Sequence, residues 1–156
     1  MKQTILKIKT LLETKLKTRV KFFYIGDPYL IPESAMPCII IEPVGTETDV
    51  ADNTRDVHHQ NITITYLIDA RDYFNKQPEE MVGFSALMEM MENENSDGSI
   101  DSNSMLGILR ENLTLDTNRY ISNITNIDYT VRKREEQLIT LETTISLVVD
   151  HYINRT

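Results

Sequence analysis

Cysteine, glycine, basic charge and long apolar runs are all scarce in this sequence of 156 residues, and each scarcity excludes a class of protein. The single cysteine, Cys38, excludes an internal disulfide framework and a zinc site built from cysteines. The five glycines supply little of the tight backbone approach that phosphate-binding loops need. No apolar run approaches the roughly 20 residues that cross a bilayer, and the lysine-rich start does not resemble a signal peptide. We therefore expect a soluble intracellular protein without a membrane partner.

Basic residues are outnumbered: 16 Lys and Arg stand against 24 Asp and Glu, for a net charge of −8. Proteins that hold nucleic acid through its phosphates need a basic surface, so such binding is not expected here. The charge is also uneven. Residues 1–21 hold seven basic groups and one acidic group, net +6, whereas residues 22–131 hold five and nineteen, net −14. This asymmetry indicates either contacts with different partners or neighbouring copies, or simply a solvated lysine face on a helix.

The length and the hydrophobic content of 40% fit a single α+β domain over residues 1–156. Apolar residues three and four positions apart predict a helix over residues 2–18. They are Ile5, Ile8, Leu12 and Leu16. The β-branched and aromatic segment 20–25 predicts a strand, and three prolines then delay regular structure until after Pro37.

Two further strands are predicted around a long polar segment. Residues 38–44 form a continuous apolar run, which predicts a strand buried on both faces. Residues 61–70 alternate between apolar and polar side chains, which predicts a strand with one buried face. The polar residues 45–60 between them predict a long hairpin with an extended tip, and loops of that length are usually functional or disordered.

The second half of the chain predicts a helix pair followed by two strands. Pro78-Glu79-Glu80 suits the first turn of a helix, and residues 92–103 read as an acidic, flexible loop before a second, shorter helix. The expected apolar helix positions are Phe84, Leu87, Met88 and Met91, then Met105, Leu106, Leu109 and Leu113. Alternating residues 127–131 and 139–149 predict strands joined by a turn at 133–136. The order α-β-β-β-α-α-β-β predicts a mixed, mainly antiparallel sheet of about five strands, with the N-terminal helix and the central helix pair packed on it.

The acidic loop has a partial match to a calcium-binding EF-hand. With Gly98 at loop position 6, oxygen-bearing residues fall at positions 1, 3, 5 and 9. They are Asn93, Asn95, Asp97 and Asp101. However, Asn93 replaces the usual acid at position 1, and Ser104 replaces the bidentate glutamate at position 12. We therefore predict no metal site and keep these four residues as a weak candidate.

No pattern of catalytic residues emerges, so we expect neither an enzyme nor a cofactor. The chain contains none of the nucleophile, phosphate-loop or zinc-protease motifs. Adjacent His58 and His59 would point to opposite faces of a strand and would not share a metal. Cys38 at the start of an apolar strand reads as a buried thiol. Acid pairs such as Asp69 with Asp72, or Glu79 with Glu80, read as solvent-facing caps at element ends.

The order of elements, with the segment Met36-Pro37-Cys38-Ile39-Ile40-Ile41-Glu42-Pro43 before a long polar hairpin, resembles the tail terminator (tail completion) proteins of long-tailed bacteriophages. The resemblance covers nearly the whole chain as a pattern and departs from the family in the length of the 92–103 loop. It implies a homo-hexameric ring that caps the head-proximal end of the tail tube, stops tube growth and joins the tail to the neck. The implied partners are the tail tube protein, a neck or head-completion protein, and genomic DNA that passes without sequence-specific binding. The implied location is the virion, with assembly in the host cytoplasm.

Under this hypothesis the charged residues divide into two groups. Candidates for subunit, tube or neck contacts are Lys2, Lys7, Lys9, Lys15, Lys17, Glu47, Asp49, Asp52, Arg55 and Asp56. Acidic candidates for the ring lumen, where they would repel phosphates, are Glu89, Glu92, Glu94 and Asp97. The alternatives are a neighbouring neck protein of the same connector, a calcium-responsive binding module and a small carboxylate enzyme. A merely mobile surface loop is an equally good explanation of residues 45–60.

Overall fold

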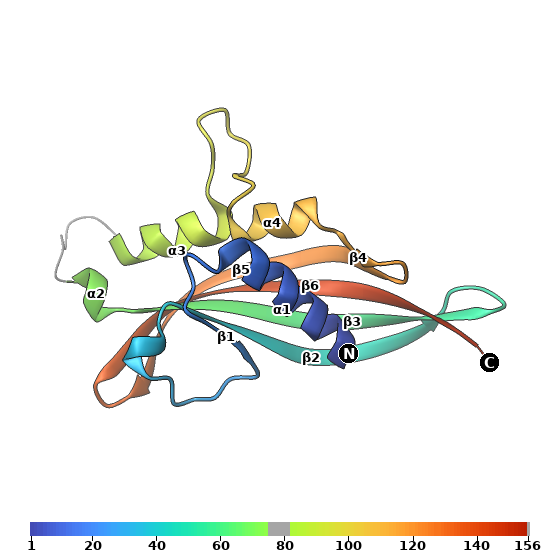
Figure 1. Cartoon of the computed structure of the whole chain (residues 1–156), viewed down its shortest axis with the longest axis horizontal. Coiled ribbons are helices and arrows are strands. Elements are labelled where there is room, and N and C mark those ends of the chain that lie inside the picture. Colours follow the sequence, from blue (N-terminus) through green and yellow to red (C-terminus); the bar gives the residue numbers. More distant parts are fainter. Residues whose placement is uncertain (75–81, 156) are drawn as a thin grey trace.

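A computed structural model describes residues 1–74 and 82–155 as one mixed sheet with helices on one face (Figure 1). The six strands lie in the order β1-β2-β3-β6-β5-β4. Their bounds are β1 Phe22–Ile25, β2 Cys38–Val50, β3 Arg55–Asp69, β4 Thr114–Asp116, β5 Arg119–Glu135 and β6 Leu138–Asn154. β1 is parallel to β2, and the other described pairings are antiparallel. The α+β prediction is confirmed, with the short strand β4 in addition to the five expected.

Three helices pack on the same face of the sheet: α1 (Lys2–Leu16), α3 (Val82–Glu92) and α4 (Met105–Glu111). The fourth helix, α2 (Arg71–Phe74), is one turn long. The main core joins the apolar face of α1 to the inward side chains of β2, β3 and β6. Its fully buried members include Ile8, Leu12, Leu16, Ile39, Ile41, Ile64, Leu87 and Ile145. The helix predicted for residues 2–18 is confirmed but ends at Leu16, and the start predicted at Pro78-Glu79-Glu80 lies outside the described residues.

The opposite face of the sheet carries a second, smaller core beneath the proline-rich connection between β1 and β2. Ile31 and Met36 from that connection pack against Cys38 and Ile40 of β2 and against Leu67 of β3. Because Ile39 and Ile41 face the main core, the start of β2 is buried on both faces, as its continuous apolar run predicts. The 3₁₀ turn η1 (Glu33–Ala35) lies within the same connection.

The long hairpin predicted around residues 45–60 is present, but the expectation that these residues form one long loop is wrong. β2 and β3 remain paired from Cys38–Leu67 to Val50–Asp56, so only residues 51–54 form the turn. A bulge between Pro43 and Gly45 accommodates the proline. The apolar pattern stops because the distal part of β2 extends beyond the helices and meets solvent on both faces (Figure 1).

Two smaller predictions in the second half are also corrected. The turn expected at residues 133–136 is shorter, because β5 continues to Glu135 and only Glu136 and Gln137 turn the chain. Leu113, expected on the second helix of the central pair, lies beyond the end of α4 and is exposed.

The β5–β6 hairpin extends the sheet at the end opposite the β2–β3 hairpin (Figure 1).

Candidate functional site

The lysines of α1 divide into paired and unpaired groups. Lys7 Nζ lies 3.3 Å from a carboxylate oxygen of Asp116, and Lys9 lies 3.0 Å from Glu13 one turn along the helix. Exposed ion pairs of this kind contribute little to stability, with a median of about 0–1 kcal/mol. Lys2, Lys15 and Lys17 are exposed and form no ion pair with a described residue. They are the members of this group that remain available to a partner.

Asp116 is held ionised at the start of the turn between β4 and β5. Burial would raise the pKa of its carboxyl, but hydrogen bonds from the Asn118 N–H, from Arg119 and from Lys7 lower that pKa to about 2. Arg119 also donates to the hydroxyl of Thr4, which in turn donates to Gln60 at a buried position. These contacts fix the N-terminal end of α1 over the sheet.

At the tip of the β2–β3 hairpin, most of the predicted contact residues are paired within the chain. Asp52 accepts hydrogen bonds from Thr54 and Arg55, and the Arg55 guanidinium lies 5.4 Å from the ring centre of Tyr152. Asp56 lies 2.7 Å from Arg155.

Glu47 and Asp49 on β2 pair with no cation among the described residues, although the Asp49 carboxylate accepts the N–H of Val50. The charged side chains of this hairpin that lack an ion-pair partner are therefore acidic, and they lie on β2.

Three of the four acidic lumen candidates gather at the end of α3. Glu89, Glu92 and Glu94 line a shallow surface pocket together with Ser85, Met88 and Asn93. The phenol of Tyr129 on β5 donates a 2.8 Å hydrogen bond to Glu92, so this acidic surface lies over β5. Burial and the Glu92 carboxylate both raise the pKa of Tyr129. Asp97, the fourth candidate, lies farther along the 92–103 loop and does not line this pocket.

The 92–103 loop, predicted to be flexible, carries hydrogen bonds between its own residues. Glu94 forms a β-bridge with Ile100, and Gly98 adopts a positive φ of 84° at the turn. Asp97 accepts hydrogen bonds from Ser99, and Asp101 accepts them from Asn93 and Asn103.

Hydrogen bonds to these carboxylates outweigh desolvation and lower the pKa of Asp97 and of Asp101. No three His, Cys, Asp or Glu side chains converge as a metal site in the part of the chain that the structure describes. The weak calcium candidate Asn93, Asn95, Asp97 and Asp101 is thus a set of residues that bond to one another and to adjacent loop residues.

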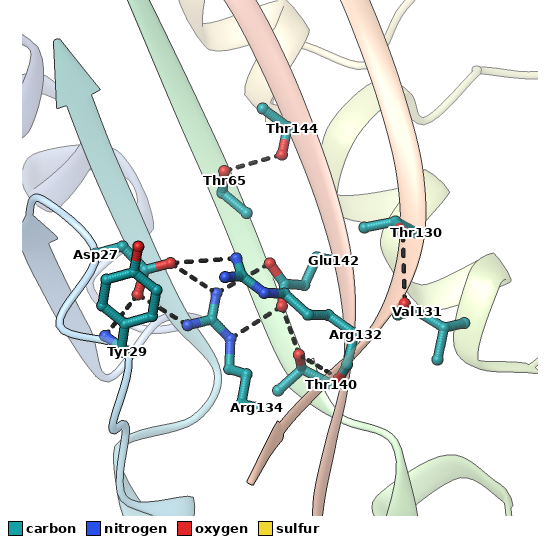
Figure 2. A network of polar contacts seen from close by, with 10 residues as sticks. All are labelled: Asp27, Tyr29, Thr65, Thr130, Val131, Arg132, Arg134, Thr140, Glu142 and Thr144. Atoms are coloured by element: carbon teal, nitrogen blue, oxygen red, sulfur yellow. Dashed lines mark hydrogen bonds and ion pairs between the residues drawn. The ribbon is translucent and has the colours of Figure 1, made fainter. Parts of the chain in front are cut away.

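A buried ionic network that the sequence does not suggest lies on the other face of the sheet (Figure 2). Arg134 on β5 is only 2% exposed and donates to two carboxylates, Asp27 at 2.8 Å and Glu142 at 3.0 Å. Burial lowers the pKa of Arg134, but both carboxylates raise it and the net shift is upward. Arg132 lies 5.9 Å from the ring centre of Tyr29 and 3.4 Å from Asp27.

This network fastens the proline-rich connection to the β5–β6 hairpin. Burial would raise the pKa of Asp27, but the bonds and charges of Arg134, with the Tyr29 N–H, lower it below its ordinary range. Asp27 and Arg134 are 107 positions apart, so no local pattern could have revealed the contact.

The histidines and the cysteine have structural surroundings. His58 faces His151 across the strands with ring centres 6.4 Å apart, while His59 lies 2.6 Å from Asp150 on the opposite face. Burial and neighbouring positive charge lower the pKa of His151. Cys38 is fully buried, and desolvation raises the pKa of its thiol to about 12, so it is poorly suited to act as a nucleophile.

Asp69 was expected to be a solvent-facing cap. It is instead buried, and its carboxylate accepts hydrogen bonds from Arg71. Burial alone would raise the pKa of Asp69, but the hydrogen bonds from Arg71 are the largest effect and lower it.

A scan of protein-family models and a search of curated proteins both return no match to this chain. Among the helices that the structure describes, none has the length and apolar character needed to cross a bilayer. The features that bear on function are therefore the chain's own: a basic helix, an acidic cluster beside β5, and two hairpins that extend the sheet.

Proposed function

We propose that this chain is a structural virion protein of a long-tailed bacteriophage. In this proposal six copies form a ring on the head-proximal end of the tail tube, stop its growth and join the tail to the neck. The observation that supports it best is that the basic and acidic side chains without an ion-pair partner lie on different elements of the described chain. Unpaired lysines lie on α1, whereas the unpaired acids lie at the end of α3 and along β2. Complementary surfaces on one molecule suit head-to-tail contacts between identical copies.

The acidic cluster suits a passage for DNA. Glu89, Glu92 and Glu94 share one surface, and a wall of carboxylates repels the phosphate backbone. DNA would then slide through the ring during ejection without sequence-specific binding. This assigns to the cluster a role that requires negative charge and no catalytic geometry.

The two hairpins suit contacts with two different partners. The β2–β3 and β5–β6 hairpins extend the sheet at opposite ends (Figure 1). Under the proposal one end meets the tail tube protein and the other meets the neck or head-completion protein. The protein would act at the tail–neck junction of the virion, after assembly in the host cytoplasm.

The test is a tube-growth assay with the tail tube protein of the phage that encodes the chain. Addition of the chain is expected to stop elongation and leave shorter tubes, because a cap removes the growing end. Glu47→Lys on the β2–β3 hairpin is expected to weaken capping, whereas the same change at exposed Glu111 on α4 leaves it intact. Unchanged tube lengths would contradict the terminator role, and binding to the neck protein alone would favour the neighbouring neck-protein class.

A further inference from the structure

The sheet has two outer edges that no strand among the described residues covers beyond the short β4, although the Val131 carbonyl on β5 accepts a hydrogen bond from the Thr130 hydroxyl. β1 ends the strand order on one side, and no other strand within residues 1–74 and 82–155 covers its outer edge. On the other side β4 is short: it pairs only with Arg119 and Tyr120, and Leu113 accepts the N–H of Ile121. The outer edge of β5 from Ser122 onward has no strand partner in the described chain.

The stretch of β5 from Asn126 to Lys133 is the regular part of that edge. Register shifts interrupt β5 between Ile121 and Asn123, between Ile124 and Asn126, and between Lys133 and Glu135. Bulges twist a strand edge and discourage pairing, whereas the eight residues without one present an even row of donors and acceptors.

The register places the two edges at the same level of the sheet. Successive cross-strand partners connect Phe22 on β1 to Thr130 on β5 through Cys38, Leu67 and Glu142. The corresponding row of partners connects Ile25 to Ile127. β5 also runs antiparallel to β1, because one parallel and three antiparallel pairings lie between them. A copy placed beside the sheet in the same orientation would therefore bring its β5 antiparallel to β1, at the level of residues 127–130.

Exposed apolar side chains accompany both edges. Phe22 and Ile25 on β1 are 52% and 49% exposed, and Val131 on β5 is 51% exposed. An apolar edge strand left open to solvent is a template for pairing with another chain. Burial of these side chains would add a hydrophobic contribution to the backbone hydrogen bonds.

Opposite charges flank the two edges on the helix-covered face. Lys17 and Lys21 lie with Phe23 around a shallow pocket between α1 and β1, which Glu13, paired with Lys9, also lines. At the other edge, Glu92 of the acidic cluster reaches β5, where it accepts the hydrogen bond of Tyr129. Phe23 and Tyr129 both pack against the main core, so the basic and acidic surfaces share one face and one level of the sheet.

We infer that β1 of one copy adds antiparallel to residues 126–133 of β5 in the next copy, with Lys17 and Lys21 beside Glu89 and Glu94 of that neighbour. The contact uses different surfaces on the two copies, so it propagates head to tail and closes only as a ring. It rests on the proposed ring function and adds the interface by which the ring forms. Because carboxylates paired with a neighbour's lysines do not repel DNA, it also withdraws Glu89 and Glu94 from the lumen role proposed above.

The test uses the full chain at millimolar concentration, as a mixture of isotopically light and heavy copies. A carbodiimide is then added, which crosslinks amines to carboxylates that are in contact. Light scattering is expected to give a molar mass that is a multiple of the 18.1 kDa of one copy. Mass spectrometry is expected to find light–heavy crosslinks between Lys17 or Lys21 and Glu89 or Glu94. An assembly whose crosslinks join other surfaces, or a chain that stays monomeric at every concentration, overturns the inference.

Charge reversal then separates this interface from a general electrostatic effect. Lys17→Glu with Lys21→Glu should weaken association by about tenfold or more, since like charges across an interface suppress binding. Adding Glu89→Lys and Glu94→Lys to the same chain should restore association. Arg110→Glu, the same charge reversal at an exposed position on α4, is the matched control and should change association less than twofold. Failure of the four-residue exchange to restore association overturns the inference.

The tube-growth assay keeps this inference distinct from the proposed function. A chain that caps tubes without the predicted crosslinks retains the function and loses this interface. A chain that forms the crosslinked ring but leaves tube growth unchanged retains the interface and loses the function.

Discussion

At the residue scale, Arg134 has the most demanding surroundings in the structure. Its guanidinium is almost fully buried between Asp27 and Glu142, whose side chains are 11% and 4% exposed. Buried ions require partners because desolvation costs several kcal/mol for each. Two carboxylates share one arginine here, so removal of that arginine leaves Glu142 with no cation and Asp27 with only the longer contact to Arg132.

Arg134→Met is expected to lower the free energy of unfolding by about 3–5 kcal/mol, the range measured when one partner of a buried pair is removed. Urea unfolding at neutral pH measures the change. Arg55→Met, which removes an exposed arginine from the hairpin tip, is the control and should cost less than about 1 kcal/mol. A loss below about 1 kcal/mol for Arg134→Met would show that the network does not hold the connection in place.

Asp116 predicts a pH dependence of stability. Its pKa falls from 3.8 to about 2 on folding, so the ionised carboxyl stabilises the folded state above pH 3.8. That contribution is lost as the pH falls toward 2, where both states bind the proton. The difference in unfolding free energy between wild type and Asp116→Asn should therefore shrink over this interval. Urea unfolding at several pH values measures it, and a difference that does not vary with pH would contradict the assignment.

Cys38 should be unreactive in the folded protein. Burial raises its thiol pKa to about 12, and the side chain is fully covered, so neither thiolate nor access is available at neutral pH. A chromogenic disulfide reagent is expected to label it only after unfolding in urea. Exposed Ser102→Cys in a Cys38→Ser background provides the reactive control. Rapid labelling of native Cys38 would show that the second core opens.

At the scale of elements, the start of α4 depends on a close approach of two backbones. Ser104 caps the helix by accepting the N–H of Gly107, and a side chain at Gly107 would overlap the carbonyl of Asp101. Alanine is ordinarily the better helix residue by about 1 kcal/mol, so only this contact explains the glycine.

Gly107→Ala is expected to lower the free energy of unfolding by about 1–3 kcal/mol, because overpacking outweighs the gain in helix propensity. Gly45→Ala on β2 is the matched control, since a Cβ there meets open space and the backbone is not in the left-handed region. Thermal unfolding of both variants measures the effect. An unchanged or raised melting temperature for Gly107→Ala would contradict the close approach.

The elements with one strong period were predictable from sequence, and those stabilised by distant partners were not. The apolar repeat predicted α1 directly. The run at residues 38–44 predicted burial on both faces, which is right for residues 38–41 and wrong for Pro43 and Val44, which are exposed. The distal half of β2 was missed because both of its faces meet solvent, and the start of β3 was missed because its residues 55–60 carry no apolar alternation, although Val57 and Gln60 are buried. β4 was missed because three residues hold too little pattern.

The candidate site was predictable in composition but not in arrangement. Uneven charge along the sequence identified the lysines of α1 and the acids near residue 92. It could not show that Lys7 and Asp56 are paired within the chain, or that Asp97 is separated from Glu89. Such pairings depend on which elements meet across the sheet.

At the scale of the whole molecule, the sheet is open at both edges, extended by hairpins at both ends, and covered by helices on one face (Figure 1). Opposite charges lie on that face near opposite edges. A molecule built in this way can contact identical neighbours on two sides and different partners above and below. These are the contacts that a capping ring requires.

Electron microscopy of tail tubes mixed with gold-labelled chain is the most direct measurement of this account. We predict label at one end only of each tube, with end-on views showing a ring of six copies around a central hole. Label distributed along the tube wall, or tubes that carry no label at either end, would contradict it.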